Sequence, residues 1–350
     1  MLKTVLDPGI DAFVAAYRGY LKVFAESRAA PVLSRGRPVK LSGFELALRV
    51  ESVTAAAEDV VALTLAGPEG ERLPAWTPGA HLDVFLPSGK QRQYSLCGSP
   101  ADHHRYRIAV RLIRDGGGGS REIHERVAAG DVLTVRGPRN AFPLVPERSY
   151  LFVAGGIGIT PLLPMVRHAQ LSGARWKLVY FGRSRRALPF LGELARFGDK
   201  VVVRTDDEHG VPDLAATLAM AEPGAAVYFC GPPPLLEGAK EILRTLNPAA
   251  RLYSERFSPP PVRGGVPFSI RLARSGREVE VGAEESALAA LRRAMPGIAY
   301  SCQQGFCGTC KVAVLSGEVD HRDATLPPAE RAHAMLPCLS RATGTLELDL

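Results

Sequence analysis

The pattern of hydrophobic and polar residues changes character twice along the chain, which divides it into regions with different predicted structures. From Phe44, short runs alternate apolar and polar residues and are separated by turn residues. Such alternation is typical of strands with one buried face, and many short strands predict a small antiparallel barrel. We expect the strands at Glu45–Val53, Val60–Ala66, Ala80–Leu86, Tyr106–Ile113 and Val132–Arg136, over a domain that spans residues 44–146.

After Pro146 the runs become continuously apolar and alternate with helical segments. Tyr150–Ala154 is an apolar strand, the glycine-rich turn Gly155–Pro161 follows it, and the helix Leu162–Gln170 comes next. Strands that alternate with helices predict a parallel α/β sheet, here over residues 147–257. Further strands are expected at Lys177–Gly182, Val201–Thr205 and Ala226–Cys230, with a helix at Leu235–Leu246. Ligands should bind at the carboxyl ends of these strands.

The second change follows the Pro- and Gly-rich segment 258–265, which reads as a linker. Beyond it we expect a small mixed α+β module over residues 266–350. Its elements are a hairpin at Pro267–Ala273 and Arg277–Val281, a helix at Glu284–Ala294, and strands at Lys311–Leu315 and Thr345–Leu350. Before the barrel, we expect a helical arm at residues 1–43, since Phe13, Tyr17, Leu21 and Phe24 recur at helical spacing. The arm is expected to pack on the first domain, with partner docking as the alternative.

Composition narrows the classes of protein that fit. The 350 residues carry a net charge of +7, and the basic excess lies before Gly264, because nine Lys and Arg face ten Asp and Glu beyond it. Phosphate-bearing cofactors explain this excess better than nucleic acid, since the arginines flank glycine-rich turns. Four of the six cysteines share one motif and the other two lie in unrelated contexts, so they do not form a disulfide framework, which favours the cytoplasm. We expect no membrane span and no signal peptide.

Four of those cysteines form the most specific pattern in the sequence. Cys302, Cys307 and Cys310 follow the spacing C-x4-C-x2-C, and Cys338 follows after 27 intervening residues. This is the plant-type spacing for a [2Fe–2S] cluster held by four thiolates. A structural zinc site usually takes two C-x2-C arms, and only one is present. Gly305 and Gly308 would let the loop curl and free backbone N–H groups to point at sulfur.

Two features of the barrel region and the turn of the α/β region suggest cofactor binding. Arg92-Gln-Tyr-Ser-Leu-Cys97 ends a strand with groups that can cover a ring and pair with a phosphate. Gly116–Arg121 precedes a short helix expected at Ser120–Ala129, and glycine runs before helices bind anions. Gly155–Pro161 resembles a dinucleotide turn only partly, because it is not G-x-G-x-x-G. The histidines show no ligand spacing, and Asp320–Asp323 is expected to be a solvated loop.

Taken in order, these motifs resemble the phthalate dioxygenase reductase group of the ferredoxin–NADP⁺ reductase superfamily, from Phe44 to Leu350. They are also similar to the reductase module of self-sufficient cytochrome P450 fusions. The matching segments include Tyr228–Pro232 and Ser254–Phe257 as well as the four cysteines. The resemblance implies a flavin barrel, a pyridine-nucleotide domain and a β-grasp-like ferredoxin domain. The arm and the arginine-rich stretch Arg183–Arg186 depart from the family.

The resemblance also implies site residues. FMN, favoured over FAD because the phosphate loop is short, would be held by Arg92, Gln93, Tyr94, Ser95, Ala109, Val110, Arg111, Gly118, Gly119, Ser120 and Phe257. NADH, with NADPH open because of the arginines, would contact Gly156, Gly158, Thr160, Pro161, Arg183, Cys230, Gly231 and Pro232, with Thr160 and Cys230 near the nicotinamide. The cluster ligands would be Cys302, Cys307, Cys310 and Cys338. Cys97 is expected to be a packed hydrophobic residue.

The function implied is that of a reductase component of an oxygenase system. It would take a hydride from NAD(P)H and pass single electrons through the cluster to a terminal oxygenase, Rieske-type or cytochrome P450. No side-chain acid, base or nucleophile is needed, because the cofactors carry the chemistry. The alternatives are a redox sensor that serves no oxygenase and a flavin-dependent oxidase. We expect a cytoplasmic monomer that binds neither nucleic acid nor membrane.

Overall fold

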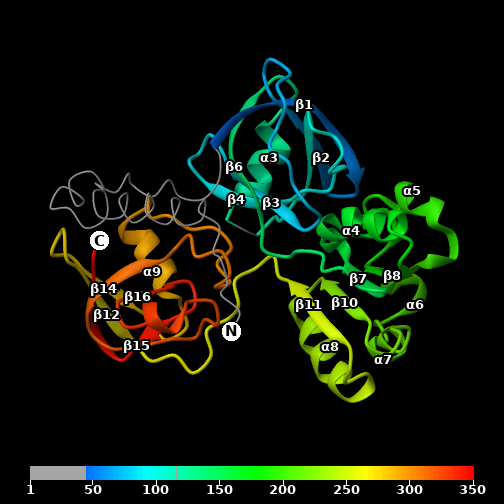
Figure 1. The fold of residues 1–350 in the computed structure, drawn as a ribbon. Helices are drawn as coiled ribbons and strands as arrows, with labels where there is room; N and C mark the ends of the chain where they lie inside the picture. The colour runs from blue at the N-terminus through cyan, green and yellow to red at the C-terminus, as the bar shows by residue number, and fades with distance from the viewer. Residues whose placement is uncertain (1–44, 116) are drawn as a thin grey trace, which may run out of the picture. The chain divides into compact units, whose positions relative to one another are not determined.

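The computed structural model describes residues 45–115 and 117–350 (Figure 1). The predicted arm, residues 1–43, and Gly116 lie outside these residues. The described strands form one sheet of six strands, two sheets of five and one of two. The multidomain fold class predicted from the sequence is therefore confirmed.

The six-stranded sheet is antiparallel, with strand order β4-β3-β6-β1-β2-β5. Its two edge strands approach each other where the backbone amide of Cys97, just after β4, donates to the carbonyl of Arg107 of β5 at 2.8 Å. Apolar side chains such as Leu82, Val84 and Ile108 fill the interior. The strands are β1 (Glu45–Ala57), β2 (Val60–Ala66), β3 (Ala80–Phe85), β4 (Gln91–Ser95), β5 (Arg105–Arg111) and β6 (Val132–Asn140), and helix α3 covers Gly119–Arg126.

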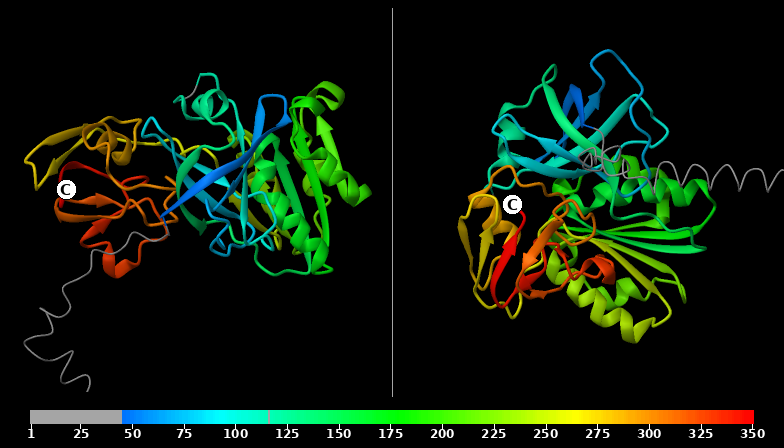
Figure 2. Two further views of the ribbon diagram at one scale, coloured as in Figure 1. Left: turned by 90° about the horizontal axis from the view of Figure 1, so that it is seen from above. Right: turned by 60° about the vertical axis from the view of Figure 1, so that its left-hand side comes forward.

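The second sheet is wholly parallel, with order β11-β10-β7-β8-β9. Alternate residues of its strands pack against helix α4 on one face and against α7 and α8 on the other (Figure 2). Strand β11 was not among the predicted elements. The bounds are β7 (Ser149–Gly155), β8 (Arg175–Gly182), β9 (Val201–Thr205), β10 (Ala226–Cys230), β11 (Arg251–Glu255), α4 (Ile159–Leu171), α5 (Leu191–Leu194), α6 (Asp206–His209), α7 (Leu214–Leu218) and α8 (Pro233–Leu246), with 3-10 turns at Gly156–Gly158, Arg185–Ala187 and Ala195–Lys200.

The third sheet is mixed, with order β13-β12-β18-β14-β16 and β12 parallel to β18. Helix α9 packs on it through Ala287, Ala290 and Leu291. This arrangement agrees with the predicted small α+β module. The elements are β12 (Phe268–Leu272), β13 (Glu278–Val281), α9 (Ala287–Ala294), β14 (Val312–Ser316), β16 (Ala334–Met335) and β18 (Gly344–Leu348), plus the two-stranded pair β15 (Val319–Asp320) and β17 (Arg341–Ala342) and a 3-10 turn at Pro328–Glu330.

A buried arginine, without a carboxylate at bonding distance among the described residues, stabilises this module through backbone carbonyls. Arg341 is 1% exposed, and its guanidinium donates to the carbonyls of Val266 (2.8 Å), Gly282 (2.9 Å) and Glu285. The guanidinium also lies over the ring of Phe268, 5.1 Å from its centroid. Val266 lies just before β12, and Gly282 and Glu285 lie in the connection between β13 and α9, so a single side chain joins the segments beside these three elements.

We therefore expect Arg341→Met to lower the free energy of unfolding of the module by about 2 kcal/mol, because buried carbonyls would lose their donors. Arg271→Met is the matched control, since Arg271 is exposed on β12 and only approaches Glu347 at 3.7 Å. Urea unfolding of both variants measures the difference. Equal effects of the two substitutions would show that the buried guanidinium does not act as a tie.

Among the described residues, no helix is both long enough and apolar enough to cross a bilayer.

Candidate functional site

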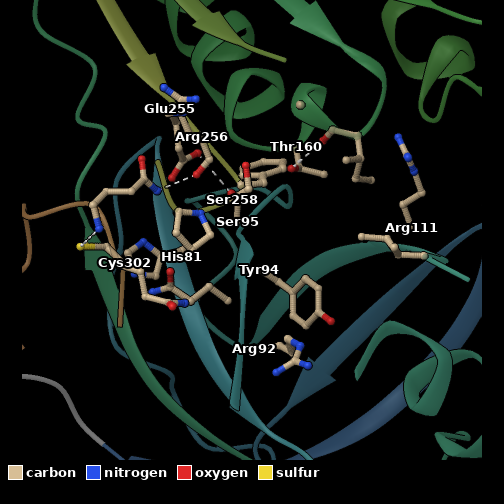
Figure 3. A pocket seen from close by; sticks show the side chains of 18 of the residues that line it. His81, Arg92, Tyr94, Ser95, Arg111, Thr160, Glu255, Arg256, Ser258 and Cys302 are labelled. Atoms are coloured by element: carbon tan, nitrogen blue, oxygen red, sulfur yellow. Dashed lines mark hydrogen bonds between the residues drawn. The ribbon is translucent and has the colours of Figure 1, made fainter. Parts of the chain in front are cut away.

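A cavity of about 690 Å³ lies where the carboxyl end of the parallel sheet, strand β4 and the cysteine loop come together (Figure 3). Its volume is in the range of cofactor pockets. It is lined by Arg92, Tyr94 and Ser95 of β4, by the glycine-rich turns of two sheets, and by Cys302. Residues more than 200 positions apart in sequence therefore share one site.

On the barrel side, Arg92 lies against the glycine loop before α3. Its guanidinium donates to the carbonyl of Gly117 at 2.9 Å, and a Cβ on Gly119 would come within 2.6 Å of its Nε. The hydroxyl of Ser120 accepts the amide of Ile113 at 3.0 Å and fixes the start of the helix. A guanidinium beside free amides at a helix start suits a phosphate.

On the nucleotide side, two loops approach so closely that a side chain would not fit. A Cβ on Gly158 would lie 2.1 Å from the carbonyl oxygen of Cys230. Thr160, in the first turn of α4, donates to the carbonyl of Ile157 at 2.9 Å. The turn after β7 and the end of β10 are thereby held together beside the cavity.

The structure brings most of the predicted cofactor residues together. Those that line the cavity are Arg92, Gln93, Tyr94, Ser95, Ala109, Arg111, Gly118, Gly119, Ser120, Gly158, Thr160, Gly231, Pro232 and Phe257. Gly156, Pro161, Arg183 and Cys230 are not among the lining residues, and Cys230 is 1% exposed. Val110 is also not among the lining residues, and its side chain is fully buried in the barrel interior.

Glu255 is a lining residue to which the sequence interpretation gave no role. It ends β11, and Ser95 donates to its Oε2 at 3.4 Å. Burial raises the pKa of the Glu255 carboxyl to about 8, so the group holds its proton at neutral pH. Burial also raises the pKa of the neighbouring Cys230 thiol, and ionisation of Glu255 would act in the same direction. The segment Ser254–Phe257 was noted as a motif, but its spacing carries no sign of this carboxyl's burial.

The four cysteines of the predicted cluster site stand as two pairs. Cys302 neighbours Cys307, and Cys310 neighbours Cys338. Interaction with Cys302 lowers the pKa of Cys307 to about 5, and interaction with Cys338 lowers the pKa of Cys310. Each pair thus holds one thiol that readily becomes the thiolate that binds metal.

Two pairs fit two irons better than one zinc. A [2Fe–2S] cluster needs two thiolates for each iron, which is what the pairs provide. The amides of Gln304 and Cys307 both lie 3.4 Å from the sulfur of Cys302, as expected for a loop that stabilises sulfur charge.

The backbone of the loop curls as the glycines suggested. Gly305 and Gly308 have φ of 78° and 67°, and a Cβ on Gly305 would come within 2.5 Å of Leu339. The expectation of a solvated loop at 320–323 was wrong for Asp323, which is 5% exposed. Asp323 accepts from the amides of Thr325 and Leu326 and from Ser340, and Thr325 in turn donates to the carbonyl of Gly305. Through Thr325, this carboxylate stabilises the backbone of the cysteine loop at Gly305.

The cavity also fits a polar cofactor on its barrel side. His81 of β3 is 4% exposed and lines the cavity, and its Nε2 has no hydrogen-bond partner among the described residues. Burial lowers the pKa of His81, so it is a neutral imidazole near pH 7. Figure 3 shows it between Ser95 and Cys302. Buried polar atoms are rarely left unpaired, so this atom suits a bound heterocycle. Cys97, by contrast, is fully buried in an apolar cluster, as expected.

An antiparallel barrel, a parallel nucleotide-type sheet and a four-thiol loop that open on one cavity define a class of protein, the flavo-iron–sulfur reductases. The comparisons with known proteins place the chain within that class. Residues 270–343 match the family model of the 2Fe-2S iron-sulfur cluster binding domain. The chain is 41% identical to phenoxybenzoate dioxygenase subunit beta of Ectopseudomonas oleovorans, over 87% of this chain and 97% of that protein.

It is 37% identical to phthalate dioxygenase reductase of Burkholderia cepacia, again over 87% of this chain and 97% of the relative. The solved structure of a phthalate dioxygenase reductase superposes with a TM-score of 0.67 at 36% identity, covering 88% of this chain and 98% of that one. An intact self-sufficient cytochrome P450 monooxygenase matches at a TM-score of 0.69 and 40% identity, and there this chain covers only 44% of the longer protein. The chain belongs to the phthalate dioxygenase reductase family of oxygenase reductase subunits, which confirms the resemblance drawn from its motifs.

Proposed function

We propose that the protein is the reductase component of an oxygenase system, and that it carries electrons from a pyridine nucleotide through FMN and a [2Fe–2S] cluster to a terminal oxygenase. The observation that carries this proposal is the shared cavity. Ser95 of the barrel, Gly158 of the nucleotide turn and Cys302 of the cluster loop all line it. A pyridine nucleotide, a flavin and a cluster bound there would lie next to one another in the order of electron transfer.

FMN supplies the conversion of a two-electron hydride into single electrons, and the cluster accepts one electron at a time. The chain's own residues bind and orient. Arg92 and the loop at 117–120 would hold the flavin phosphate, and Tyr94 would lie against the ring. Cys302, Cys307, Cys310 and Cys338 would hold the cluster, two to each iron.

NADH is favoured over NADPH by the charges at the carboxyl end of β9. Helix α6 places Asp206, Asp207 and Glu208 there, and Glu208 pairs with Arg185 at 2.8 Å. Carboxylates at this end would repel a 2′-phosphate, and the pairing partly neutralises the arginine that could bind it. Arg183 is exposed and stays a candidate contact to the nucleotide.

Relatives indicate the kind of partner. They include a carnitine monooxygenase reductase subunit of Escherichia coli, 40% identical over 87% of this chain and 98% of that protein. We propose a separate terminal oxygenase of the Rieske or cytochrome P450 type as the acceptor, and a monomeric reductase in the cytoplasm. The six free cysteines suit a reducing compartment.

The test is steady-state reduction of cytochrome c with NADH and with NADPH, on protein whose released flavin has been identified by chromatography. We expect FMN, rapid reduction with NADH, and a clear preference for NADH over NADPH. Slow cytochrome c reduction by protein with full flavin and iron content would refute the proposal and favour a redox sensor.

Arg92→Ala is expected to weaken FMN binding by about tenfold or more, because a hydrogen bond to a charged group contributes about 1.5–3 kcal/mol. Flavin fluorescence on titration of the flavin-free protein measures the dissociation constant. Arg126→Ala is the control, since Arg126 is exposed in the last turn of α3, away from the glycine loop. Unchanged FMN affinity in Arg92→Ala would remove Arg92 from the phosphate site.

A further inference from the structure

One face of the β3–β4 hairpin meets the cysteine loop through polar side chains. At its centre is Asp83, which is 0% exposed. Its Oδ1 accepts hydrogen bonds from the side-chain amide of Gln93 at 2.9 Å and the hydroxyl of Ser301 at 3.0 Å. Its Oδ2 accepts one from the guanidinium of Arg139 of β6 at 2.9 Å. Ser301 directly precedes Cys302, so the buried carboxylate binds the residue at the start of the cysteine loop.

Arg139, the ion-pair partner of Asp83, also contacts the other end of the cysteine loop. Its guanidinium donates to the hydroxyl of Thr309 at 3.2 Å, and Thr309 directly precedes Cys310. The side chains of Arg139 and Asp83 are 10% and 0% exposed. One ion pair of the barrel therefore contacts the residue before the first and the residue before the third cysteine of the motif.

Further bonds surround this pair. Gln91 donates to the carbonyl of Tyr300 at 2.8 Å, and Gln93 reaches Ser301 at 2.6 Å as well as Asp83. Gln304 donates to the carbonyl of Arg256 at 2.6 Å, just after the end of β11. The loop that holds the cysteines is thus joined to the cavity wall by directed hydrogen bonds along its length.

A buried ion pair is a poor source of stability, because the cost of removing two charges from water offsets most of their attraction. Its best-attested use is to specify one arrangement among several. An apolar contact would tolerate sliding of the loop, whereas a carboxylate with three donors accepts one register. Such selection matters here because residues 258–265 are a Pro- and Gly-rich connection that constrains the cluster module little.

We propose that Asp83, through Arg139, is a positioning residue that fixes the cysteine loop at the cavity and so sets the rate of electron transfer from the flavin to the cluster. Electron transfer between two bound groups falls steeply with their separation. A loop that can move away spends less time at the productive distance. The proposal rests on the proposed function and concerns a residue that does not line the cavity.

The test compares the wild type with Asp83→Asn, which keeps the size of the side chain and removes its charge. In rapid mixing with NADH, flavin reduction should keep its rate, while cluster reduction, followed by its electron paramagnetic resonance signal, should slow by about tenfold or more. The line shape of that signal should not change. Hydrogen exchange of the amides in 300–310, which does not depend on turnover, should become faster.

Glu51→Gln is the matched control, because Glu51 pairs with Arg105 on the exposed surface of the same barrel. It should change neither rate nor exchange. If Asp83→Asn does not fold, Ser301→Ala removes a single bond of the network and should shift both readouts in the same direction by a smaller amount. Wild-type exchange and wild-type cluster reduction in the folded variant would overturn the proposal. Absence of cluster reduction in the wild type would instead refute the proposed function, while the exchange comparison would still decide the positioning role.

Discussion

Cys338→Ser is expected to abolish electron delivery to cytochrome c and to leave reduction of ferricyanide by NADH largely intact. Ferricyanide can take electrons directly from the flavin, whereas cytochrome c would be served through the cluster. Cys338 is 4% exposed and lies beside Cys310, so it completes one of the two thiol pairs. Loss of a residue that only supports a metal ligand costs 10–100-fold, so loss of the ligand itself should cost more than about 100-fold.

The matched control is Cys97→Ser. Cys97 is also buried, but it belongs to the barrel and donates to the carbonyl of Arg107 at 3.4 Å, a bond that serine can keep. It should retain both activities. Iron content and the electron paramagnetic resonance signal of the reduced protein report the cluster directly. Retention of that signal together with cytochrome c reduction in Cys338→Ser would remove Cys338 from the ligand set.

The sequence was most informative where function demands a fixed local spacing. The cysteine motif and the glycine turns are contiguous segments whose chemistry depends on near neighbours, so Cys302–Cys310 could be interpreted without a structure. The parallel sheet was equally accessible, because buried strands such as Tyr150–Ala154 read as unbroken apolar runs. The family resemblance then supplied an order for these pieces.

Strand register separates residues that the prediction treated alike. Ala109, Val110 and Arg111 were all assigned to the flavin, but successive residues of a strand point to opposite faces. In the structure Ala109 and Arg111 line the cavity, and the side chain of Val110 packs in the interior of the barrel. The assignment of Val110 therefore stays a prediction that concerns its backbone alone.

The polar residues Asp83, Arg139 and Glu255 could not have been found in this way. Asp83 and Ser301 are 218 positions apart, and Ser95 and Glu255 are 160 apart. A polar residue in a strand is ordinarily expected on the solvent face, and only the packing of another module on that face buries it. Burial at long range has no local signature, so such groups become visible only in the folded chain.

Glu255→Gln is expected to change how stability depends on pH. The pKa of Glu255 is about 8 in the folded protein, raised by burial from an ordinary value of 4.5. Between these values the folded state holds a proton that the unfolded state has lost, so stability falls as pH rises from about 4.5 to 8. At 1.36 kcal/mol for each unit, the loss is on the order of 5 kcal/mol, and glutamine removes it.

The free energy of unfolding in urea should therefore favour Glu255→Gln over the wild type increasingly between pH 5 and pH 9. Glu241→Gln, exposed on α8, should follow the wild type at every pH. The rate of flavin reduction by NADH should report the same ionisation. In the wild type this rate should change as the pH passes 8, because Glu255 becomes a carboxylate beside Ser95. In Glu255→Gln the rate should not change in this pH range. A difference between variant and wild type that does not grow with pH would mean that Glu255 is ionised in the folded protein, since only a carboxyl that holds its proton produces this slope.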